Sequence, residues 1–386
     1  MEKEIGTFEL LGSDPSCAAR RGRLHTAHGT VETPVFMPVG TQATVKAMSP
    51  REMEEMDCEI LLGNTYHLND RPGPDLVERM GGLHRFMGWD RAILTDSGGY
   101  QVFSLGKLNK ITSEGVSFRS HSDGRQHFIG PRESMEIQRK LGSDIAMVFD
   151  ECPPYPCTED YACKAVERTL DWAAICREAP RAKDQLVFGI VQGSVFPALR
   201  EECAAGLVGM DFDGYAIGGV SVGEPDELIL RGVDDSVCHL PEGKPRYLMG
   251  VGEMAQMVES IARGVDMFDC VMPTRQARNG TVSTRRGRYP VKAAIYKEDT
   301  RPLEEGCTCY ACRHFSRAYV RHLLNVGEIF GLRLVTMHNL HCYLELLKDI
   351  RMAIAAGEFA TFRADFHAQY RLVLEEHVEK VKENNG

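Results

Sequence analysis

Residues 145–192 read IAMVFDECPPYPCTEDYACKAVERTLDWAAICREAPRAKDQLVFGIVQ, and the fold is predicted from this stretch. The apolar runs 145–149 and 186–191 are too short and too uniformly apolar for strands that face solvent, so they predict strands buried on both faces of a parallel sheet. Between them, Thr158 is a helix-start signal for a helix over 158–178. The stretch therefore predicts a strand, a helix and a second, parallel strand.

The same alternation recurs from residue 35 to residue 270. Further strands are predicted at 35–39, 59–62, 92–94, 214–217, 246–249 and 265–270. Further helices are predicted at 49–56, 74–80, 131–141, 197–208, 224–237 and 254–263, several with proline in the first turn. This order predicts an α/β fold, a (β/α)₈ TIM barrel, with an open doubly wound sheet as the alternative that strand periodicity does not separate.

Composition describes a soluble globular chain of 386 residues with 43% apolar residues. A net charge of −10 argues against a general nucleic-acid coat or a basic membrane binder. Residues 275–297 depart from this trend, because they hold seven basic residues and no acidic residue. Any contact with nucleic acid is therefore expected at a local basic patch.

Cysteine usage indicates a reducing compartment. The cysteines number 13, an odd count, and Met1–Gly6 lacks the apolar segment of a secretion signal. No apolar run reaches the roughly 18 to 20 residues that cross a bilayer. We expect a cytoplasmic protein without a membrane partner, whose thiols are mostly reduced and available as metal ligands.

A cysteine-rich segment predicts a zinc site. Cys307, Cys309 and Cys312 form C-x-C-x-x-C, and His338 follows after 25 intervening residues. Three thiolates and one imidazole complete a closed tetrahedral Zn²⁺ shell, which is structural because it leaves no position for water. His341 and His314 are rival fourth ligands that the sequence does not separate from His338, and buried free thiols are the alternative to metal binding.

Polar residues end four of the predicted strands: Asp96, Asp150, Gln192 and Asp269. In a barrel these strand ends share one rim, so the side chains are expected to converge. Asp269 is suited to attack a sugar anomeric carbon, with Asp96 handling protons, as in retaining glycosyl transfer. A salt bridge between Asp269 and Arg275 is the structural alternative.

The other two groups suit the recognition of a purine ring. A carboxylate at Asp150 can accept two parallel hydrogen bonds from an edge such as that of guanine, although a helix cap or an exposed loop acid is an equal alternative. Gln192 and the backbone of Gly218 and Gly219 can donate to a ring carbonyl oxygen. The Asp-Ser-Gly-Gly sequence at 96–99 also resembles the surroundings of a serine-protease nucleophile, here Ser97, but the strand–helix alternation contradicts that interpretation.

Taken together, the motifs resemble those of bacterial-type tRNA-guanine transglycosylases, from about residue 6 to about residue 370. The matching segments are GNTYHL (63–68), DSGGYQ (96–101), FDEC (149–152), VQG (191–193), GGVSVGE (218–224), YLMGVG (247–252), DCVMPTR (269–275) and the cysteine cluster. Each is weak alone, and their order and spacing are specific.

The resemblance implies a barrel with an inserted zinc subdomain and a transferase of the pentosyl class. It implies that guanine at the anticodon wobble position of GUN-anticodon tRNAs (Asp, Asn, His, Tyr) is exchanged for 7-aminomethyl-7-deazaguanine in queuosine biosynthesis. Asp269 would be the nucleophile that forms a covalent ribosyl-tRNA intermediate, and Asp96 the general acid and base. A homodimer and one structural Zn²⁺ per subunit are also implied.

The resemblance assigns further residues to binding. Tyr100 and Met249 would sandwich the base, and the Val220 carbonyl, set by Glu224, would accept from the aminomethyl group. The full substrate-binding set is Asp96, Ser97, Gly98, Gly99, Tyr100, Asp150, Gln192, Gly219, Val220 and Met249. The RNA-contacting segments would be Gly250, Val251, Gly252, Glu253, Met254, Ala255 and Gln256, and Thr274, Arg275, Gln276, Ala277 and Arg278.

This sequence departs from the family pattern at a few positions. Val220 replaces a common Leu, Glu253 opens a segment where a Thr-Pro-Glu-Asp-like turn is common, and Ala293 replaces a common Asn. The acid at Glu253 leaves the RNA contacts of its segment open. The cluster of Arg285, Arg286 and Arg288 either compensates or is a solvated surface run.

Three related functions compete with this prediction. A non-catalytic tRNA-binding subunit is disfavoured because both Asp96 and Asp269 are present. An archaeal-type enzyme is disfavoured because the chain ends soon after the zinc subdomain. A preference for free queuine is disfavoured because Val222 should narrow the space for a large substituent. We expect a catalytic barrel at 1–275, a basic and zinc-binding segment at 276–345 and a helical segment packed on the barrel at 346–386.

Overall fold

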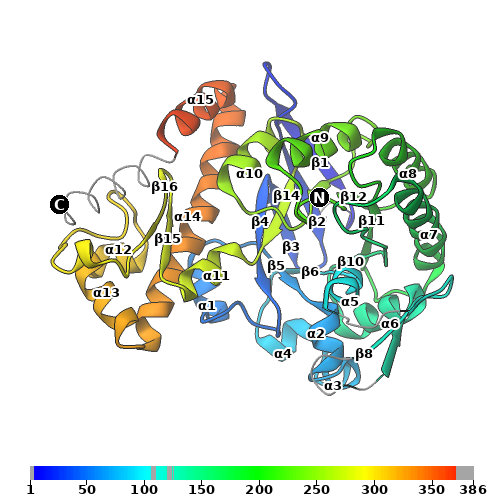
Figure 1. Ribbon diagram of the computed structural model, residues 1–386, viewed down its shortest axis with the longest axis horizontal. Coiled ribbons are helices and arrows are strands. Elements are labelled where there is room, and N and C mark those ends of the chain that lie inside the picture. The colour runs from blue at the N-terminus through cyan, green and yellow to red at the C-terminus, as the bar shows by residue number, and fades with distance from the viewer. Residues whose placement is uncertain (1–3, 106–109, 120–123, 125, 371–386) are drawn as a thin grey trace.

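The computed structural model describes residues 4–105, 110–119, 124 and 126–370, and it contains a closed barrel of eight parallel strands (Figure 1). The last barrel strand pairs with the first, for example Met267 with Val35, which confirms the TIM barrel over the open sheet. Every predicted strand is present. They are β4 (Val35–Gly40), β5 (Ile60–Gly63), β6 (Ala92–Thr95), β10 (Ile145–Met147), β11 (Leu186–Val191), β12 (Gly214–Ile217), β13 (Arg246–Leu248) and β14 (Met267–Cys270).

The strands are buried as their sequences predict. Every residue of β4, β5, β6, β11 and β12 is buried, because the barrel interior is filled by side chains on one face and helices cover the other. The predicted helices are also present, with ends displaced by at most two residues. They are α1 (Pro50–Glu55), α3 (Pro74–Arg79), α6 (Pro131–Leu141), α7 (Glu159–Glu178), α8 (Pro197–Gly209), α9 (Asp226–Val237) and α10 (Met254–Ile261).

Local chemistry explains where these helices begin. Ser49 and Glu52 form a reciprocal capping box at the start of α1, with Pro50 in its first turn. The side chain of Thr158 accepts a hydrogen bond from the backbone N–H of Tyr161 at the start of α7. These short-range signals are readable in the sequence, so helix positions are predictable without the tertiary structure.

Several elements were not predicted. An antiparallel sheet of β1 (Phe8–Ser13), β2 (Arg20–Thr26) and β3 (Gly29–Thr33) lies at the end of the barrel where its strands begin. In the turn between β2 and β3, the backbone N–H of His28 donates to Asp144, directly before β10. After β3, the backbone N–H of Val35 donates to the carbonyl oxygen of Asp266, directly before β14. A second small sheet and three short helices were also missed, because their sequences are mixed and short. They are β7 (Lys110–Ile111), β8 (Val116–Arg119), β9 (Gln126–Ile129), α2 (Thr65–Asp70), α4 (Gly82–Met87) and α5 (Gly99–Leu105).

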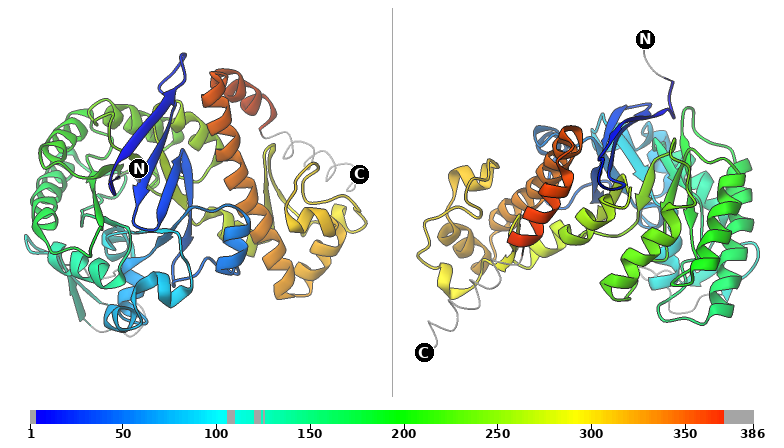
Figure 2. Two further views of the ribbon diagram at one scale, coloured as in Figure 1. Left: turned by 180° about the vertical axis from the view of Figure 1, so that it is seen from behind. Right: turned by 90° about the horizontal axis from the view of Figure 1, so that it is seen from above.

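A smaller unit follows the barrel and has its own apolar core. Figures 1 and 2 show it beside the barrel, with the long helix α14 (Ile329–Ala356) between the two. Leu334 and Val335 of α14 belong to the smaller core, whereas Leu340 and Leu347 belong to the barrel core. The other elements are α11 (Met272–Arg278), β15 (Thr281–Thr284), β16 (Gly287–Pro290), η1 (Ala294–Tyr296), α12 (Tyr310–His314), α13 (Arg317–Asn325) and α15 (Phe359–Gln369).

The domain boundary predicted at residue 345 falls inside α14, and residues 371–386 of the predicted C-terminal segment lie outside the described residues. The division into three segments stays a prediction. In the ranges that the structure describes, no helix is both long enough and apolar enough to span a membrane.

Candidate active site and metal centre

Four polar residues mark the end of the barrel where its strands finish, here called the mouth. Asp96 directly follows β6, Asp150 lies three residues beyond β10, Gln192 directly follows β11, and Asp269 is in β14. Asp269 and Asp150 both raise the pKa of Asp96 electrostatically, which places the three carboxylates near one another. The predicted convergence is therefore present.

Asp96 is held by the start of helix α2. Its carboxylate accepts hydrogen bonds from Asn64 Nδ2 at 2.6 Å and from the backbone N–H of Thr65 at 2.8 Å. Burial is the largest influence on its pKa, and the neighbouring carboxylates add to it, which raises the pKa to about 7 in spite of these hydrogen bonds. Asp96 is thus poised to give or take a proton at neutral pH.

Asp150 lies in a short chain of side chains. Ser97 Oγ donates to its Oδ1 at 3.2 Å, and Gln192 Nε2 donates to its Oδ2 at 2.7 Å. Burial raises the pKa of Asp150 to about 6, against the lowering effect of these two donors. The Ser97 hydroxyl therefore donates to a carboxylate. Among the described residues, it has no hydrogen bond to a histidine that could act as its base.

Two glycines make room for Gln192. A Cβ at Gly219 would lie 2.3 Å from Gln192 Oε1, and Gly219 has a φ of +62°, which favours glycine. A Cβ at Gly218 would lie 2.7 Å from Gln192 Nε2. Within the described residues, the buried Oε1 of Gln192 has no hydrogen-bond partner. A buried polar atom without a partner indicates a place where a ligand group completes the hydrogen bonding.

Asp269 is oriented by two donors on the same oxygen. Tyr247 Oη donates to Oδ1 at 2.6 Å and the backbone N–H of Gly250 donates to Oδ1 at 2.7 Å. No described residue donates to Oδ2. Burial raises the pKa of Asp269, while the two donors oppose that shift. One oxygen is thus fixed by the protein and the other is left for chemistry at the mouth.

Glu224 shapes the loop after β12. Its carboxylate accepts from the backbone N–H of Ser221 at 2.5 Å and of Val222 at 2.9 Å. Ser221 has a φ of +60°, a backbone conformation that a non-glycine residue adopts rarely. Glu224 therefore holds the peptide units that follow Val220, as expected for a supporting residue.

Tyr100 and Met249 lie in two different parts of the mouth. Tyr100 is the second residue of α5 and is half exposed, and Met249, directly after β13, is partly buried. No contact joins them in the described structure, so their sandwich of a base stays a prediction. Gly99 does lie close to Asp150, because a Cβ there would be 2.8 Å from the carbonyl oxygen of Asp150.

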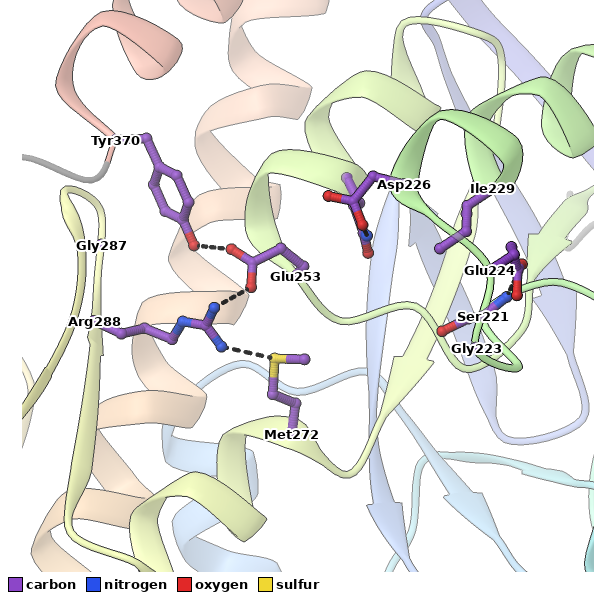
Figure 3. Close-up of a pocket in the computed structure, with 11 residues that line it drawn as sticks. Ser221, Gly223, Glu224, Asp226, Ile229, Glu253, Met272, Gly287, Arg288 and Tyr370 are labelled. Atoms are coloured by element: carbon purple, nitrogen blue, oxygen red, sulfur yellow. Dashed lines mark hydrogen bonds and ion pairs between the residues drawn. The ribbon is translucent and has the colours of Figure 1, made fainter. Parts of the chain in front are cut away.

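A pocket of about 450 Å³ adjoins the mouth between the loop after β12, the start of α10 and hairpin β15–β16 (Figure 3). Glu253, the acid that departs from the family pattern, pairs with Arg288 at 2.7 Å and accepts a hydrogen bond from Tyr370. Gln256 Nε2 donates to Asp226 at 2.9 Å in the same wall. The charge of Glu253 is therefore already paired within the protein.

The two segments predicted to contact RNA differ in exposure from residue to residue. Gly250, Arg275 and Arg278 are exposed and Gln276 is partly exposed. The side chains of Val251, Met254, Thr274 and Ala277 are buried, and buried Gly252 packs against Cys270. Arg275 and Arg278 therefore offer the most exposed side chains of these segments to a ligand outside the protein.

The basic cluster is only partly solvated. Arg285 pairs with Asp349 at 2.9 Å, whereas Arg286 is exposed. Arg288 likewise pairs with Glu253, so both of these arginines have acidic partners within the protein. The segment is therefore less strongly cationic than its sequence alone indicates.

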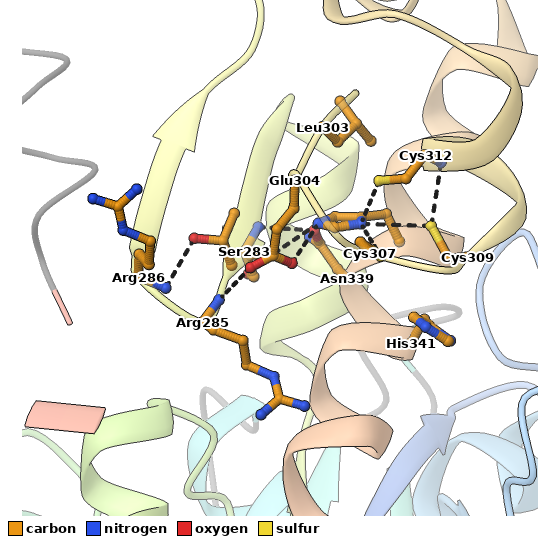
Figure 4. Close-up of polar contacts among 12 residues, drawn as sticks. Ser283, Arg285, Arg286, Leu303, Glu304, Cys307, Cys309, Cys312, Asn339 and His341 are labelled. Carbon is orange, nitrogen blue, oxygen red and sulfur yellow. Dashed lines mark hydrogen bonds and ion pairs between the residues drawn. The ribbon is translucent and has the colours of Figure 1, made fainter. Parts of the chain in front are cut away.

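The cysteine cluster has the geometry of a closed metal site (Figure 4). The sulfur atoms of Cys307, Cys309 and Cys312 lie 3.6, 3.6 and 3.3 Å from His338 Nδ1. Zinc bonds of about 2.3 Å to sulfur and 2.0–2.1 Å to nitrogen in a tetrahedron require a sulfur–nitrogen spacing of about 3.6 Å. These four residues could hold a metal ion.

The structure also separates the rival ligands. His338 Nε2 lies 3.0 Å from the carbonyl oxygen of Ser283, the kind of contact that orients a metal-bound imidazole. His341 contacts Thr308 and His314 packs against the ring of Tyr310, and neither belongs to the four residues whose ligand atoms converge. His338 is therefore the histidine of the cluster.

Some functional residues escaped sequence reasoning. Asn64, Thr65 and Tyr247 each hydrogen-bond a mouth carboxylate, but no role was predicted for them. Asn64 and Thr65 directly follow β5, so their position at a barrel strand end was the available signal. Tyr247 lies inside an apolar run, where its hydroxyl gives no sequence signal.

Comparisons with known proteins identify the family. The family model described as Queuine tRNA-ribosyltransferase matches residues 14–372. A queuine tRNA-ribosyltransferase of Pelotomaculum thermopropionicum is 57% identical over 95% of this chain and 99% of its own length. Proteins of the same name from Moorella thermoacetica and Desulforamulus reducens are 56% and 58% identical, over 94% and 90% of this chain and 98% and 94% of their own lengths. The chain therefore belongs to the queuine tRNA-ribosyltransferase family of pentosyltransferases.

Proposed function

We propose that this protein exchanges guanine for 7-aminomethyl-7-deazaguanine at the wobble position of tRNAs with a GUN anticodon, those for Asp, Asn, His and Tyr. The observation that carries the proposal is the pair of Asp269 and Asp96 at one mouth, the first with one oxygen unpartnered by described residues and the second with a pKa of about 7. The exchange is a step of queuosine biosynthesis.

Double displacement accounts for both carboxylates. Asp269 attacks C1′ of the wobble ribose, and a bond forms from its oxygen to C1′ as the bond from C1′ to N9 of guanine breaks. The departing guanine keeps the electron pair and takes a proton from Asp96. Asp96 then removes the N9 proton of the incoming base, N9 attacks C1′, and Asp269 leaves as a carboxylate, so the ribose keeps its configuration.

The base pocket would be formed by the chain of polar groups around Asp150. As a carboxylate, Asp150 would accept from the N1–H and exocyclic amino group of the base. The Nε2 group of Gln192 and the Gly219 N–H would donate to the ring carbonyl on the opposite side. Ser97, Gly98 and Gly99 would line the pocket, Tyr100 and Met249 would cover the two faces of the ring, and the Val220 carbonyl would accept from the aminomethyl group.

The anticodon loop would lie across the mouth beside the pocket that Figure 3 shows. Exposed Arg275 and Arg278 are suited to its phosphates, and the wobble base must leave the stack to reach the mouth. Because Glu253 is paired with Arg288, it does not add an unpaired negative charge to this surface. A chain of net charge −10 would then hold RNA by a local, salt-sensitive contact.

We also propose that the cysteine cluster holds one structural Zn²⁺ per subunit. Three thiolates and one imidazole suit Zn²⁺, and the spacing of the ligand atoms fits its bond lengths. The ion would connect the loop before α12 to α14 and so stabilise the smaller core.

We also propose that the protein is cytoplasmic, because its proposed substrate, tRNA, is found there and because thiols stay reduced in that compartment.

A homodimer is supported by exposed apolar side chains near the metal centre. Four such side chains, on α12, on α13, directly after α13 and at the start of α14, are between 41% and 72% exposed: Tyr310, Tyr319, Val326 and Ile329. Light scattering at micromolar concentration should give the mass of a dimer, and Ile329→Lys should shift it toward the monomer. Met352→Lys is the matched control, because Met352 is also exposed on α14 but lies far along the helix. A wild-type monomer would contradict the proposal.

The deciding experiment measures base exchange and the covalent intermediate together. Wild-type protein should incorporate labelled guanine into unmodified tRNA-Tyr and give a protein–RNA adduct that survives a denaturing gel. Asp269→Asn should lose both signals. Incorporation without an adduct would support exchange but contradict double displacement, and tRNA binding with neither signal in the wild type would identify a non-catalytic subunit.

A further inference from the structure

A second cluster of metal-type ligands lies at the opposite end of the barrel from the mouth. It consists of His28 in the turn between β2 and β3, His84 on α4 and Asp144 directly before β10. The three residues are separated widely in sequence and belong to three different elements. Nothing in the proposed transfer reaction uses them, because the strands begin, rather than end, on this side.

The geometry of the cluster is convergent. His28 Nδ1 lies 2.8 Å from Asp144 Oδ1, and His84 Nε2 lies 3.0 Å from Asp144 Oδ2. The two imidazole rings are stacked, with centroids 3.6 Å apart and planes 16° from parallel. Both rings therefore direct one nitrogen at the same carboxylate.

The carboxylate is fixed in place by the backbone. The N–H of His28 donates to Oδ1 at 3.0 Å and the N–H of Ile93 donates to Oδ2 at 2.8 Å. With the two imidazoles, these bonds give the two oxygens of Asp144 four donors. Metal-bound carboxylates are commonly held by such outer hydrogen bonds.

We propose that His28 Nδ1, His84 Nε2 and a carboxylate oxygen of Asp144 form a binding site for one divalent transition-metal ion. Bonds of about 2.0–2.2 Å at angles of about 90–110° place ligand atoms about 2.8–3.6 Å apart. The two observed spacings, 2.8 and 3.0 Å to different oxygens of Asp144, lie within that range, and the three ligand atoms all lie within 4.8 Å of one another. Each imidazole would bind the ion in its neutral form, with its single proton on the other ring nitrogen.

The exposure of the ligand side chains gives a metal ion a path into the site and leaves coordination positions open to water. The side chain of His28 is 40% exposed, that of His84 is 11% exposed, and that of Asp144 is buried. Three protein ligands beside solvent leave positions for water, unlike the closed cysteine cluster. Two imidazoles and one carboxylate suit Zn²⁺, Ni²⁺ or Co²⁺. The bound ion joins the β2–β3 turn to α4 and the start of β10, so it stabilises the fold and takes no part in base exchange.

Nickel titration of the tag-free, full-length protein tests the site. The protein keeps the ion at its cysteine cluster, and calorimetry should show one additional, saturable Ni²⁺ per chain. His28→Gln and His84→Gln should each weaken that binding by more than about tenfold, since glutamine retains an N–H donor for Asp144 but is a poor ligand. His239→Ala, a partly exposed histidine outside the cluster, is the matched control and should bind as the wild type does.

Two outcomes overturn the proposal. No saturable extra ion up to about 1 mM Ni²⁺ would do so, as would equal binding by wild type and by both glutamine variants. X-ray absorption of the bound nickel should show nitrogen and oxygen neighbours, and a sulfur shell would assign the ion to the cysteine cluster instead. If His84→Gln does not fold, the more exposed His28→Gln still decides, because Ni²⁺ should raise the Tm of the wild type and not of that variant.

Discussion

The two ends of the barrel treat buried carboxylates in opposite ways. At the strand beginnings, Asp144 accepts two backbone and two imidazole hydrogen bonds, and its pKa is lowered. At the mouth, Asp96 is almost as deeply buried, but it faces two other carboxylates and its pKa rises to about 7. Burial alone therefore does not decide the charge state of an acid in this molecule.

This difference shows which end of the barrel is stabilised by its carboxylate and which end is destabilised. Asp144 gains partners from two elements and the start of a strand, so its charge holds the architecture together. The mouth concentrates Asp96, Asp150 and Asp269 with fewer donors than three carboxylates can accept. Carboxylates with raised pKa values at the rim where barrel strands end are typical of an active site. The rest of the barrel offsets the loss of folding stability that these carboxylates cause.

The largest expected effect separates the two ends by activity. Asp269→Asn should lower kcat for guanine exchange at least about 10³-fold, because an amide is a poor nucleophile and the two donors to Oδ1 remain. Asp144→Asn should keep the kcat of the folded fraction within about twofold, because the residue is remote from the mouth. Exchange kinetics on folded, quantified protein measure both. Equal losses of kcat in the two variants would contradict the assignment of catalysis to the mouth alone.

The next effect separates the ends by stability. Asp144→Asn should lower the free energy of unfolding by about 3 kcal/mol, because buried donors lose a charged acceptor. Denaturant unfolding followed by circular dichroism measures the change. Asp75→Asn is the control, since exposed Asp75 pairs with Lys140 at the surface and its loss should cost far less. A smaller loss at Asp144 than at Asp75 would contradict the stabilising role given to the end of the barrel where its strands begin.

A third prediction concerns the pH dependence of stability. The pKa of Asp96 is about 7 in the folded protein and near 3.8 when unfolded, so folding becomes less favourable as pH rises between these values. Asp96→Asn removes that cost, and its Tm relative to wild type should increase from pH 5 to pH 8. The net gain at pH 8 should be about 1–2 kcal/mol after the loss of charged hydrogen bonds. Scanning calorimetry at both values tests it, and a relative Tm that falls with pH would show Asp96 to be ionised and stabilised.

The smallest expected effect concerns guanine binding. Asp150 has a pKa of about 6 and must be ionised to accept two hydrogen bonds from the base edge. Guanine affinity should therefore fall as pH drops below about 6, by up to about tenfold per unit. Asp150→Asn should bind weakly with no such dependence below neutral pH. Fluorescence or calorimetric titration of guanine measures it, and a flat wild-type profile between pH 5 and pH 7 would contradict the assignment.

The sequence predicted the barrel well because its strands and helices are specified locally. Each buried strand is a short apolar run, and each helix start carries a side chain such as Ser49 or Thr158 that caps it. The small sheets β1–β3 and β7–β9 were missed because their alternation is interrupted by charged residues and their pairing is antiparallel between short segments.

The residues of the candidate site also fall into those that the local sequence predicts and those that depend on contacts between distant segments. Asp96, Asp150, Gln192 and Asp269 were predictable, because the rule that strand ends share one rim converts their positions into proximity. Tyr247 and Asn64 were not, because their roles depend on which side chain faces them across neighbouring strands. The choice of His338 over His341 likewise required the register of α14, which places His338 Nδ1 within 3.6 Å of all three sulfur atoms.

The sequence by itself determined the barrel, the residues at its mouth and the composition of the metal cluster, because short-range periodicity and spacing encode them. Only the tertiary structure decided the charge states of those residues and the partners that hold them. A pKa depends on burial and on charges brought from elsewhere in the chain, as Asp96 and Asp144 show. The pairing of Glu253 with Arg288 is of the same kind, since contacts between distant segments exist only once the chain has folded.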